Sequence, residues 1–315
     1  MVATSENKIR KINMNDCIDL QVNGYGGVDF NIADLTVEAV KTATEKLIAD
    51  GTVGYLPTMC THDPELLIGA VRTIQAARKK YAVCEKTILG YFFEGPFISD
   101  KPGAVGAHAP EWVQKPSLEL FGRFQDAAEG MIRMVNVAAE VEGMPEFVRA
   151  LTESGVTVTL GHQLAKSPKD IEACIEAGAK AFTHLGNGLP NDINRHENII
   201  NTALVEDRAS VMFIPDGHHL PDTMLKLYSR AVPLERLVAV SDAQYPTGMP
   251  PGVYSVGGLD AVLEANGKLW YPPRKCLVGA TTPLKKCMEV FQRATGLTER
   301  ECRVIAHDNP LELIN

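Results

Sequence analysis

The chain has 315 residues, of which 45% are apolar and 22% charged, and its formal net charge at pH 7 is −8. This composition predicts a globular protein with a sizeable core, and it argues against a general binder of nucleic acids or membrane surfaces. No apolar run is long enough to span a bilayer, and the first residues, MVATSENKIRK, lack the apolar core of an export signal. We therefore expect a cytoplasmic protein with neither nucleic acid nor a membrane as its partner.

Eight short apolar runs, many rich in β-branched residues, predict buried parallel strands. In chain order they cover residues 17–22, 52–57, 87–93, 131–138, 156–160, 179–183, 210–214 and 237–240. Helical patterns lie between several of them, at 36–50, 63–80, 145–154 and 170–177. A capping residue followed by proline marks the start of two of these helices, and a glycine follows the end of three.

The alternation of strands and helices predicts an α/β fold, a closed (β/α)8 barrel of the TIM type. An open doubly wound sheet would alternate in the same way. Polar residues gather just after most of the runs, and in a barrel these strand ends converge on one face. An open sheet would spread them along an edge, so we favour the barrel.

The segment 252–272 has a different pattern. Its alternation and the Asn266-Gly267 turn predict a small β-hairpin inserted after the eighth strand. Helical patterns follow at 284–294 and 299–306.

Three potential metal ligands follow strand-like runs: Glu94 the third, His162 the fifth and His184 the sixth. Taken singly, the acid would cap a helix or pair with an arginine, and each histidine would be a hydrogen-bonded structural residue. Together, one carboxylate and two imidazoles at equivalent strand ends predict a metal site with a position open for water. Zn²⁺, Fe²⁺, Co²⁺ and Mn²⁺ all suit these donors, and such a site indicates metal-assisted hydrolysis.

Asp242 follows the eighth run. A carboxylate beside the metal could accept a proton from the attacking water, and a helix N-cap is the alternative role.

The seven cysteines are scattered without a CxxC pair, which predicts reduced thiols. A catalytic thiol or a cysteine-ligated metal is the alternative reading of the cysteines.

An ordered series of motifs runs through nearly the whole chain, from about residue 16 to residue 315. It comprises IDLQVNGYGG, YLPT, EGP, GAH, GH, THLGNGLP, PDGHHL, SDA and LVGAT. The series resembles the N-acetylglucosamine-6-phosphate deacetylases of the amidohydrolase superfamily, and an ordered series is more specific than any single motif. The resemblance implies a barrel of the metal-dependent hydrolase kind. It also implies hydrolysis of an acetamide on an amino-sugar phosphate, as part of amino-sugar metabolism.

By position, the resemblance implies that Glu94, His162 and His184 hold one catalytic metal ion, with Zn²⁺ as the first expectation. Asp242 would be the general base and acid. His108 would contact the amide carbonyl of the substrate and stabilise the charge that develops on its oxygen.

The resemblance also implies a substrate-binding set. Its members are Ala107, His108, Asn187, Gly188, Arg195, Asp216, Gly217, His218, His219, Leu277, Val278 and Gly279. Arg195 and His219 would bind the phosphate, and residues 277–279 would surround the acyl end. In the family the phosphate arginine comes from the neighbouring subunit, which implies a homodimer.

The first strand bears on the number of metal ions. Many members of the superfamily have His-x-His there, whereas this chain has Gln21-Val22-Asn23. Amides are poorer ligands than imidazoles for a transition metal, so we expect one tightly bound ion.

Three features depart from the family pattern. Family members carry a small β-sandwich built from both chain ends, whereas we expect residues 1–315 to form a single barrel domain without it. Gly186 and Gly188 replace larger residues, and the segment 190–200 lacks the usual glycine-rich pattern. An amidohydrolase acting on another N-acyl sugar or amide is therefore an alternative, and a non-catalytic sugar-phosphate-binding protein is a second.

Overall fold

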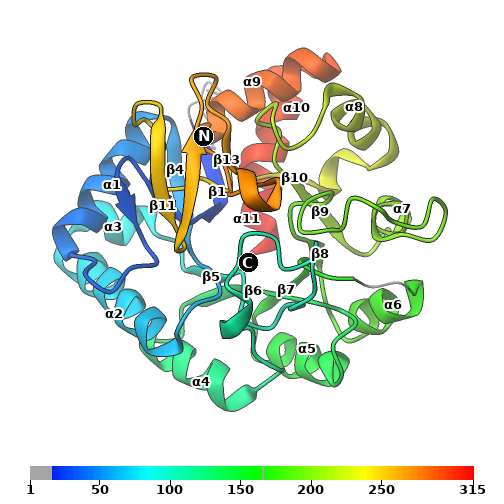
Figure 1. Ribbon diagram of the computed structural model, residues 1–315, viewed down its shortest axis with the longest axis horizontal. Helices are drawn as coiled ribbons and strands as arrows, with labels where there is room; N and C mark the ends of the chain where they lie inside the picture. The colour runs from blue at the N-terminus through cyan, green and yellow to red at the C-terminus, as the bar shows by residue number, and fades with distance from the viewer. Residues whose placement is uncertain (1–15, 165–166) are drawn as a thin grey trace, which may run out of the picture.

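The computed structural model describes residues 16–164 and 167–315. Eight parallel strands form its centre, and helices surround them (Figure 1). The strands pair in chain order: β1 (Cys17–Val22), β4 (Thr52–Met59), β5 (Tyr91–Phe93), β6 (Ile132–Val137), β7 (Thr157–Leu160), β8 (Ala181–Phe182), β9 (Ser210–Phe213) and β10 (Leu237–Ala239). The predicted (β/α)8 barrel is confirmed.

The sheet closes just beyond its last strand. Val22 and Ala243 form a parallel bridge, and the backbone N–H of Asn23 donates to the carbonyl oxygen of Ala243 over 2.8 Å. The C-terminal ends of β1 and β10 therefore lie side by side, although they come from distant parts of the chain.

Seven strands lie within about two residues of the predicted runs, and the third is shorter than predicted. Thr87, expected to begin a strand, is the last residue of α3 (Ala82–Thr87), and β5 begins at Tyr91. Ile88 is buried and forms an isolated bridge with Tyr55. The connection is apolar because it is buried, which explains why it reads as part of a strand.

The outer layer is formed by α1 (Val37–Ala49), α2 (Pro64–Lys80), α4 (Leu118–Ala127), α5 (Met144–Glu153), α6 (Pro168–Glu176), α7 (Ile199–Val205), α8 (Asp222–Ala231) and α9 (Leu284–Thr295). Asp63 and Ser167 cap the first turns of α2 and α6 through their side chains, ahead of a proline. These two helix starts were predicted from the sequence. Within the described residues, no helix has the length and apolar character needed to cross a membrane.

Apolar side chains fill the interior of the barrel, among them Ile18, Leu20, Leu56, Phe92, Met134, Met212 and Val238.

The predicted helix 299–306 is divided: α10 (Glu299–Arg303) passes through a π-helical turn (Val304–Asp308) into α11 (Asn309–Leu313). Leu313 packs against the interior cluster, and the hydroxyl of Thr157 donates to its carbonyl oxygen over 2.8 Å. Because Thr157 begins β7, α11 covers the N-terminal end of the barrel, and Figure 1 shows it behind the barrel centre.

The segment after β10 is larger than the predicted hairpin. It forms an antiparallel sheet of β11 (Gly252–Val256), β12 (Leu259–Leu263), β13 (Leu269–Tyr271) and β14 (Cys276–Leu277), which we call the inserted sheet. A two-stranded hairpin is marginal alone, and the additional strands help to build a separate apolar cluster of Val256, Ala261, Leu263, Leu269 and Val278. A short hairpin, β2 (Gly24–Tyr25) and β3 (Val28–Asp29), also follows β1.

Candidate metal centre

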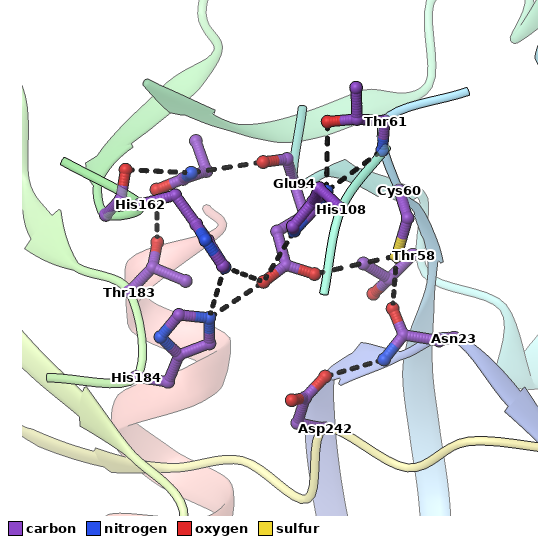
Figure 2. Close-up of polar contacts among 12 residues, drawn as sticks. Asn23, Thr58, Cys60, Thr61, Glu94, His108, His162, Thr183, His184 and Asp242 are labelled. Atoms are coloured by element: carbon purple, nitrogen blue, oxygen red, sulfur yellow. Dashed lines mark hydrogen bonds and ion pairs between the residues drawn. The ribbon is translucent and has the colours of Figure 1, made fainter. Parts of the chain in front are cut away.

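The predicted ligands meet at the C-terminal ends of their strands. Glu94 directly follows β5, and His162 and His184 follow β7 and β8 after one intervening residue each. Glu94 Oε1 lies 2.8 Å from His184 Nε2 and 3.2 Å from His162 Nε2, and the two Nε2 atoms are 3.1 Å apart. All three residues are buried, and Figure 2 shows their polar atoms converging on one point.

The donor set fits a divalent first-row metal. His162 Nδ1 lies 2.7 Å from the carbonyl oxygen of Ala104, which only accepts hydrogen bonds. Nδ1 therefore carries the proton, and Nε2 presents a lone pair to Glu94. Burial lowers the pKa of His162, which keeps the ring neutral near pH 7. The lone pair of His162 Nε2 and the carboxylate of Glu94 lie 3.2 Å apart and repel one another unless a cation lies between them.

Glu94 remains charged in this position. Burial by itself would raise its pKa, but contacts with imidazole N–H groups, that of His108 first, outweigh that effect and hold the pKa well below its usual range. Among the described residues, Glu94, His162 and His184 form a buried group that could hold a metal ion.

One buried amide ties together the loops that carry the ligands. Asn136, on β6, donates from Nδ2 to the carbonyl oxygens of Glu94 and Gly161 over 3.1 and 3.3 Å. Its Oδ1 accepts a hydrogen bond from the hydroxyl of Thr183 over 2.8 Å. Asn136 therefore contacts Glu94 itself and the residue before each histidine ligand, and no metal-site motif in the sequence pointed to it.

Three site residues have left-handed backbone. The φ angles are 51° at His162, 27° at His184 and 52° at Asp242. Non-glycine residues rarely adopt such values, and they gather at functional sites whose surroundings fix them.

Asp242 follows β10 and faces the first strand. Its Oδ1 accepts hydrogen bonds from Asn23 Nδ2 over 2.6 Å and from Gln21 Nε2 over 3.3 Å. No described residue forms a hydrogen bond with Oδ2, so this oxygen is the one left for chemistry. Burial, and then the negative charge of Glu94, raise the pKa of Asp242 well above its ordinary value. The side chain is therefore suited to take up a proton.

His108 lies at the same centre with its tautomer fixed. The backbone N–H of Thr61 donates to His108 Nδ1 over 3.2 Å, and the hydroxyl of Thr61 lies 2.9 Å from the same atom. Since a backbone N–H can only donate, a neutral His108 carries its proton on Nε2. That nitrogen lies 3.9 Å from Glu94 Oε1, so the ring presents an N–H donor at the metal centre.

A cleft with a volume of ≈ 730 Å³ opens above the metal centre. Eight of the predicted substrate-binding residues line it: Ala107, His108, Asn187, Gly188, His219, Leu277, Val278 and Gly279. A cleft of this volume accommodates a sugar phosphate.

The other four predicted residues, Arg195, Asp216, Gly217 and His218, lie outside the lining. Asp216 Oδ2 lies 2.8 Å from His219 Nδ1, so Asp216 orients the histidine that reaches the cleft. The ring of His218 turns to the carbonyl oxygen of Asn266 instead. Arg195 is exposed on the connection between β8 and α7.

Several lining residues were not predicted from the sequence. Arg274 and Lys275, from the inserted sheet, are the arginine and lysine among the described lining residues. The two cations are adjacent in the inserted segment, and this pairing is the sequence signal that could have predicted them.

Cys60 also lines the cleft, and nothing in the sequence separates it from the other cysteines. Burial, and then the charge of Glu94, raise the pKa of Cys60 well above its usual value, so its sulfur keeps its proton.

No family model matches the sequence, but curated relatives do. It is 31% identical over 256 residues to the N-acetylglucosamine-6-phosphate deacetylase of Bacillus subtilis, covering 80% of this chain and 63% of that protein. It is 27% identical over 303 residues to the N-acetylgalactosamine-6-phosphate deacetylase of Escherichia coli O157:H7, covering 94% of this chain and 76% of that protein. The chain thus spans less than two thirds of the Bacillus protein and about three quarters of the other.

The human N-acetylglucosamine-6-phosphate deacetylase is 30% identical over 307 residues, covering 94% of this chain and 73% of the human protein. A solved structure agrees, that of a Mycobacterium smegmatis N-acetyl-D-glucosamine-6-phosphate deacetylase variant in complex with N-acetyl-D-glucosamine-6-phosphate. It superposes with a TM-score of 0.84 at 27% identity, covering 95% of this chain and 77% of that one. By its fold and by its identity to the human protein, the chain belongs to the N-acetylglucosamine-6-phosphate deacetylase family.

Proposed function

We propose that this chain hydrolyses the acetamide of N-acetylglucosamine 6-phosphate, giving glucosamine 6-phosphate and acetate. Membership of the family supports the substrate. The convergence of Glu94, His162 and His184 next to the Asp242 carboxylate is the observation that carries the chemistry. The protein would act in the cytoplasm.

Glu94, His162 and His184 would hold one divalent metal, and Zn²⁺ suits their nitrogen and oxygen donors, with Fe²⁺, Co²⁺ and Mn²⁺ as alternatives. A metal bound there would polarise the amide carbonyl and make water acidic enough to attack it. Gln21 and Asn23, which stand where imidazoles would hold a second ion, donate to Asp242 instead. This use of the two amides supports a single metal.

Asp242 would carry the proton. As water attacks the carbonyl carbon and the new C–O bond forms, Oδ2 takes a proton from the water. Asp242 then gives this proton to the amide nitrogen, so that the C–N bond breaks and the nitrogen leaves as an amine. The Nε2–H of His108 would donate to the carbonyl oxygen while negative charge builds there.

At the other end of the substrate, His219 would bind the phosphate from a position that Asp216 fixes. Asn187 and Gly188 would lie along the sugar phosphate, and Leu277, Val278 and Gly279 around the acetyl group. Arg195 is exposed and outside the cleft lining, which supports a contribution to a neighbouring subunit's phosphate in a homodimer.

Release of acetate from four compounds tests the proposal: N-acetylglucosamine 6-phosphate, its unphosphorylated form, and the two galacto counterparts. We expect the first to give the highest kcat/KM. Faster turnover of N-acetylgalactosamine 6-phosphate would instead assign the activity for which the Escherichia coli relative is named. Binding without turnover by metal-loaded protein would support a sugar-phosphate-binding protein instead.

A further inference from the structure

Cys60 forms a hydrogen bond at the edge of the metal centre that the proposed reaction leaves unexplained. We propose that Cys60 is a positioning residue for Asp242 and that it acts through the side-chain amide of Asn23. This inference rests on the proposed deacetylase activity, since it concerns the group that moves the proton in that reaction.

The polarity of the contacts gives the amide one orientation. Cys60 Sγ lies 3.0 Å from Asn23 Oδ1, and Asn23 Nδ2 lies 2.6 Å from Asp242 Oδ1 (Figure 2). The amide oxygen only accepts, so the thiol donates to it, and the amino end then donates to the carboxylate. With the amide turned over, its oxygen would face a carboxylate oxygen and its N–H₂ would face a thiol proton. The thiol therefore helps to select the orientation in which Asn23 supports Asp242.

The three residues come from three strand ends, and other bonds hold their backbone in place. Cys60 follows β4, Asn23 follows β1 and Asp242 lies beyond β10. The backbone N–H of Cys60 donates to Asn31 Oδ1 over 2.9 Å, and Asn31 Nδ2 donates to the carbonyl oxygen of Asn23 over 3.3 Å. These bonds do not involve the thiol, so changing the Cys60 side chain removes the donor while the loop stays tied.

A direct role at the metal is the competing explanation. Cys60 Sγ also lies 3.7 Å from Glu94 Oε2, a longer contact than the one to Asn23. The group of described residues whose ligand atoms converge contains Glu94, His162 and His184, without Cys60. The shorter contact thus leads to Asn23 and onward to Asp242, away from the ligands.

The experiment compares Cys60→Ala, Cys60→Ser and Cys60→Val in metal-loaded enzyme, with N-acetylglucosamine 6-phosphate as substrate. We expect kcat to fall about tenfold in the alanine and valine variants, as for loss of one hydrogen bond, with KM and metal content unchanged. Serine keeps a donor and should restore most of kcat. Valine fills the space of the thiol, so the valine variant should show the same fall in kcat even if the alanine variant does not fold.

Cys84→Ala is the matched control, because Cys84 is a buried thiol whose sulfur also lies near an oxygen, 3.7 Å from Thr44 Oγ1, between α1 and α3. Its kcat per folded molecule should equal that of the wild type. A double-mutant cycle with Asn23→Ala adds a readout that general destabilisation would not move. If Cys60 acts through Asn23, then Cys60→Ala causes no further loss of kcat in that background.

Three results would overturn the inference while the wild type remains active: unchanged kcat in the alanine and valine variants, a serine variant as slow as alanine, or loss of metal from the variants. Full additivity with Asn23→Ala would do the same. A wild-type protein without turnover would contradict the proposed function and this inference together.

Discussion

His162, His184 and Asp242 share a backbone conformation that side chains with a Cβ rarely adopt. Each such residue costs about 1 to 3 kcal/mol, and the packing around it must hold it there. Three of them at one centre indicate that the fold gives up stability to direct these side chains at a common point.

Asp242→Asn removes the proposed proton acceptor and keeps the shape of the side chain. We expect kcat to fall about 10³-fold, because asparagine cannot take the proton from water or return it to the amine. Metal content should stay near one ion per chain, since Asp242 lies outside the ligand group. Acetate release and elemental analysis of the same sample check both points. Deacetylation that persists in this variant would contradict the role of Asp242.

Asn136→Ala removes the amide that joins the three ligand loops. Residues that orient metal ligands typically contribute about 10- to 100-fold to metal affinity. We expect a loss of that size, measured by competition with a chelator. Asn201→Ala, at an exposed amide on α7, is the control. Equal metal affinity in the Asn136 and Asn201 variants would show that the ligands hold themselves in place.

At the scale of elements, the inserted sheet reaches the loop that carries His108. Arg274 Nη1 donates to the carbonyl oxygens of Gly106 and His108 over 3.1 and 3.4 Å. Ala107 packs against the apolar cluster of the inserted sheet. This sheet therefore supports the loop of His108, the proposed oxyanion donor.

Arg274→Ala should loosen this support. Loss of one or two hydrogen bonds predicts a fall of roughly five- to tenfold in kcat, and the effect should be similar for phosphorylated and unphosphorylated substrates. Arg72→Ala, an exposed position on α2, should leave kcat unchanged. A loss confined to the phosphorylated substrate would instead indicate that Arg274 binds phosphate.

The sequence predicted those elements whose signal is local. The strands are apolar runs, and Glu94, His162 and His184 follow them directly, so both the barrel and the ligand group could be read from neighbouring residues. The contact between Asn23 and Asp242 spans 219 positions and exists only because the sheet closes. The short strand β14 has too few residues to show a pattern, which is why the sheet was read as a hairpin.

At the scale of the whole molecule, the two ends of the barrel have different tasks. The helix α11 and its apolar contacts cover the N-terminal end, while the cleft and the metal centre occupy the other. Substitutions at the covered end should act on stability, and those at the open end on turnover.

Metal removal should affect both properties, because the ligand atoms face one another in the folded barrel. We expect a chelator to abolish acetate release and to lower the Tm by several degrees. Binding at 1,000 times Kd contributes about 4 kcal/mol to the free energy of unfolding. Readdition of one equivalent of Zn²⁺ should restore both. Two ions bound with equal affinity would contradict the single-metal proposal.

The bridge between Val22 and Ala243 closes the ring of strands, and the proposed catalysis depends on that closure. A folding intermediate with the middle strands paired would already gather Glu94, His162 and His184, because all three follow strands of the consecutive run from β5 to β8. It would lack an oriented Asp242, whose amide partners belong to the opposite edge of the unclosed sheet. During refolding, metal capture should therefore precede the return of turnover, and the interval between them measures the time that the barrel takes to close.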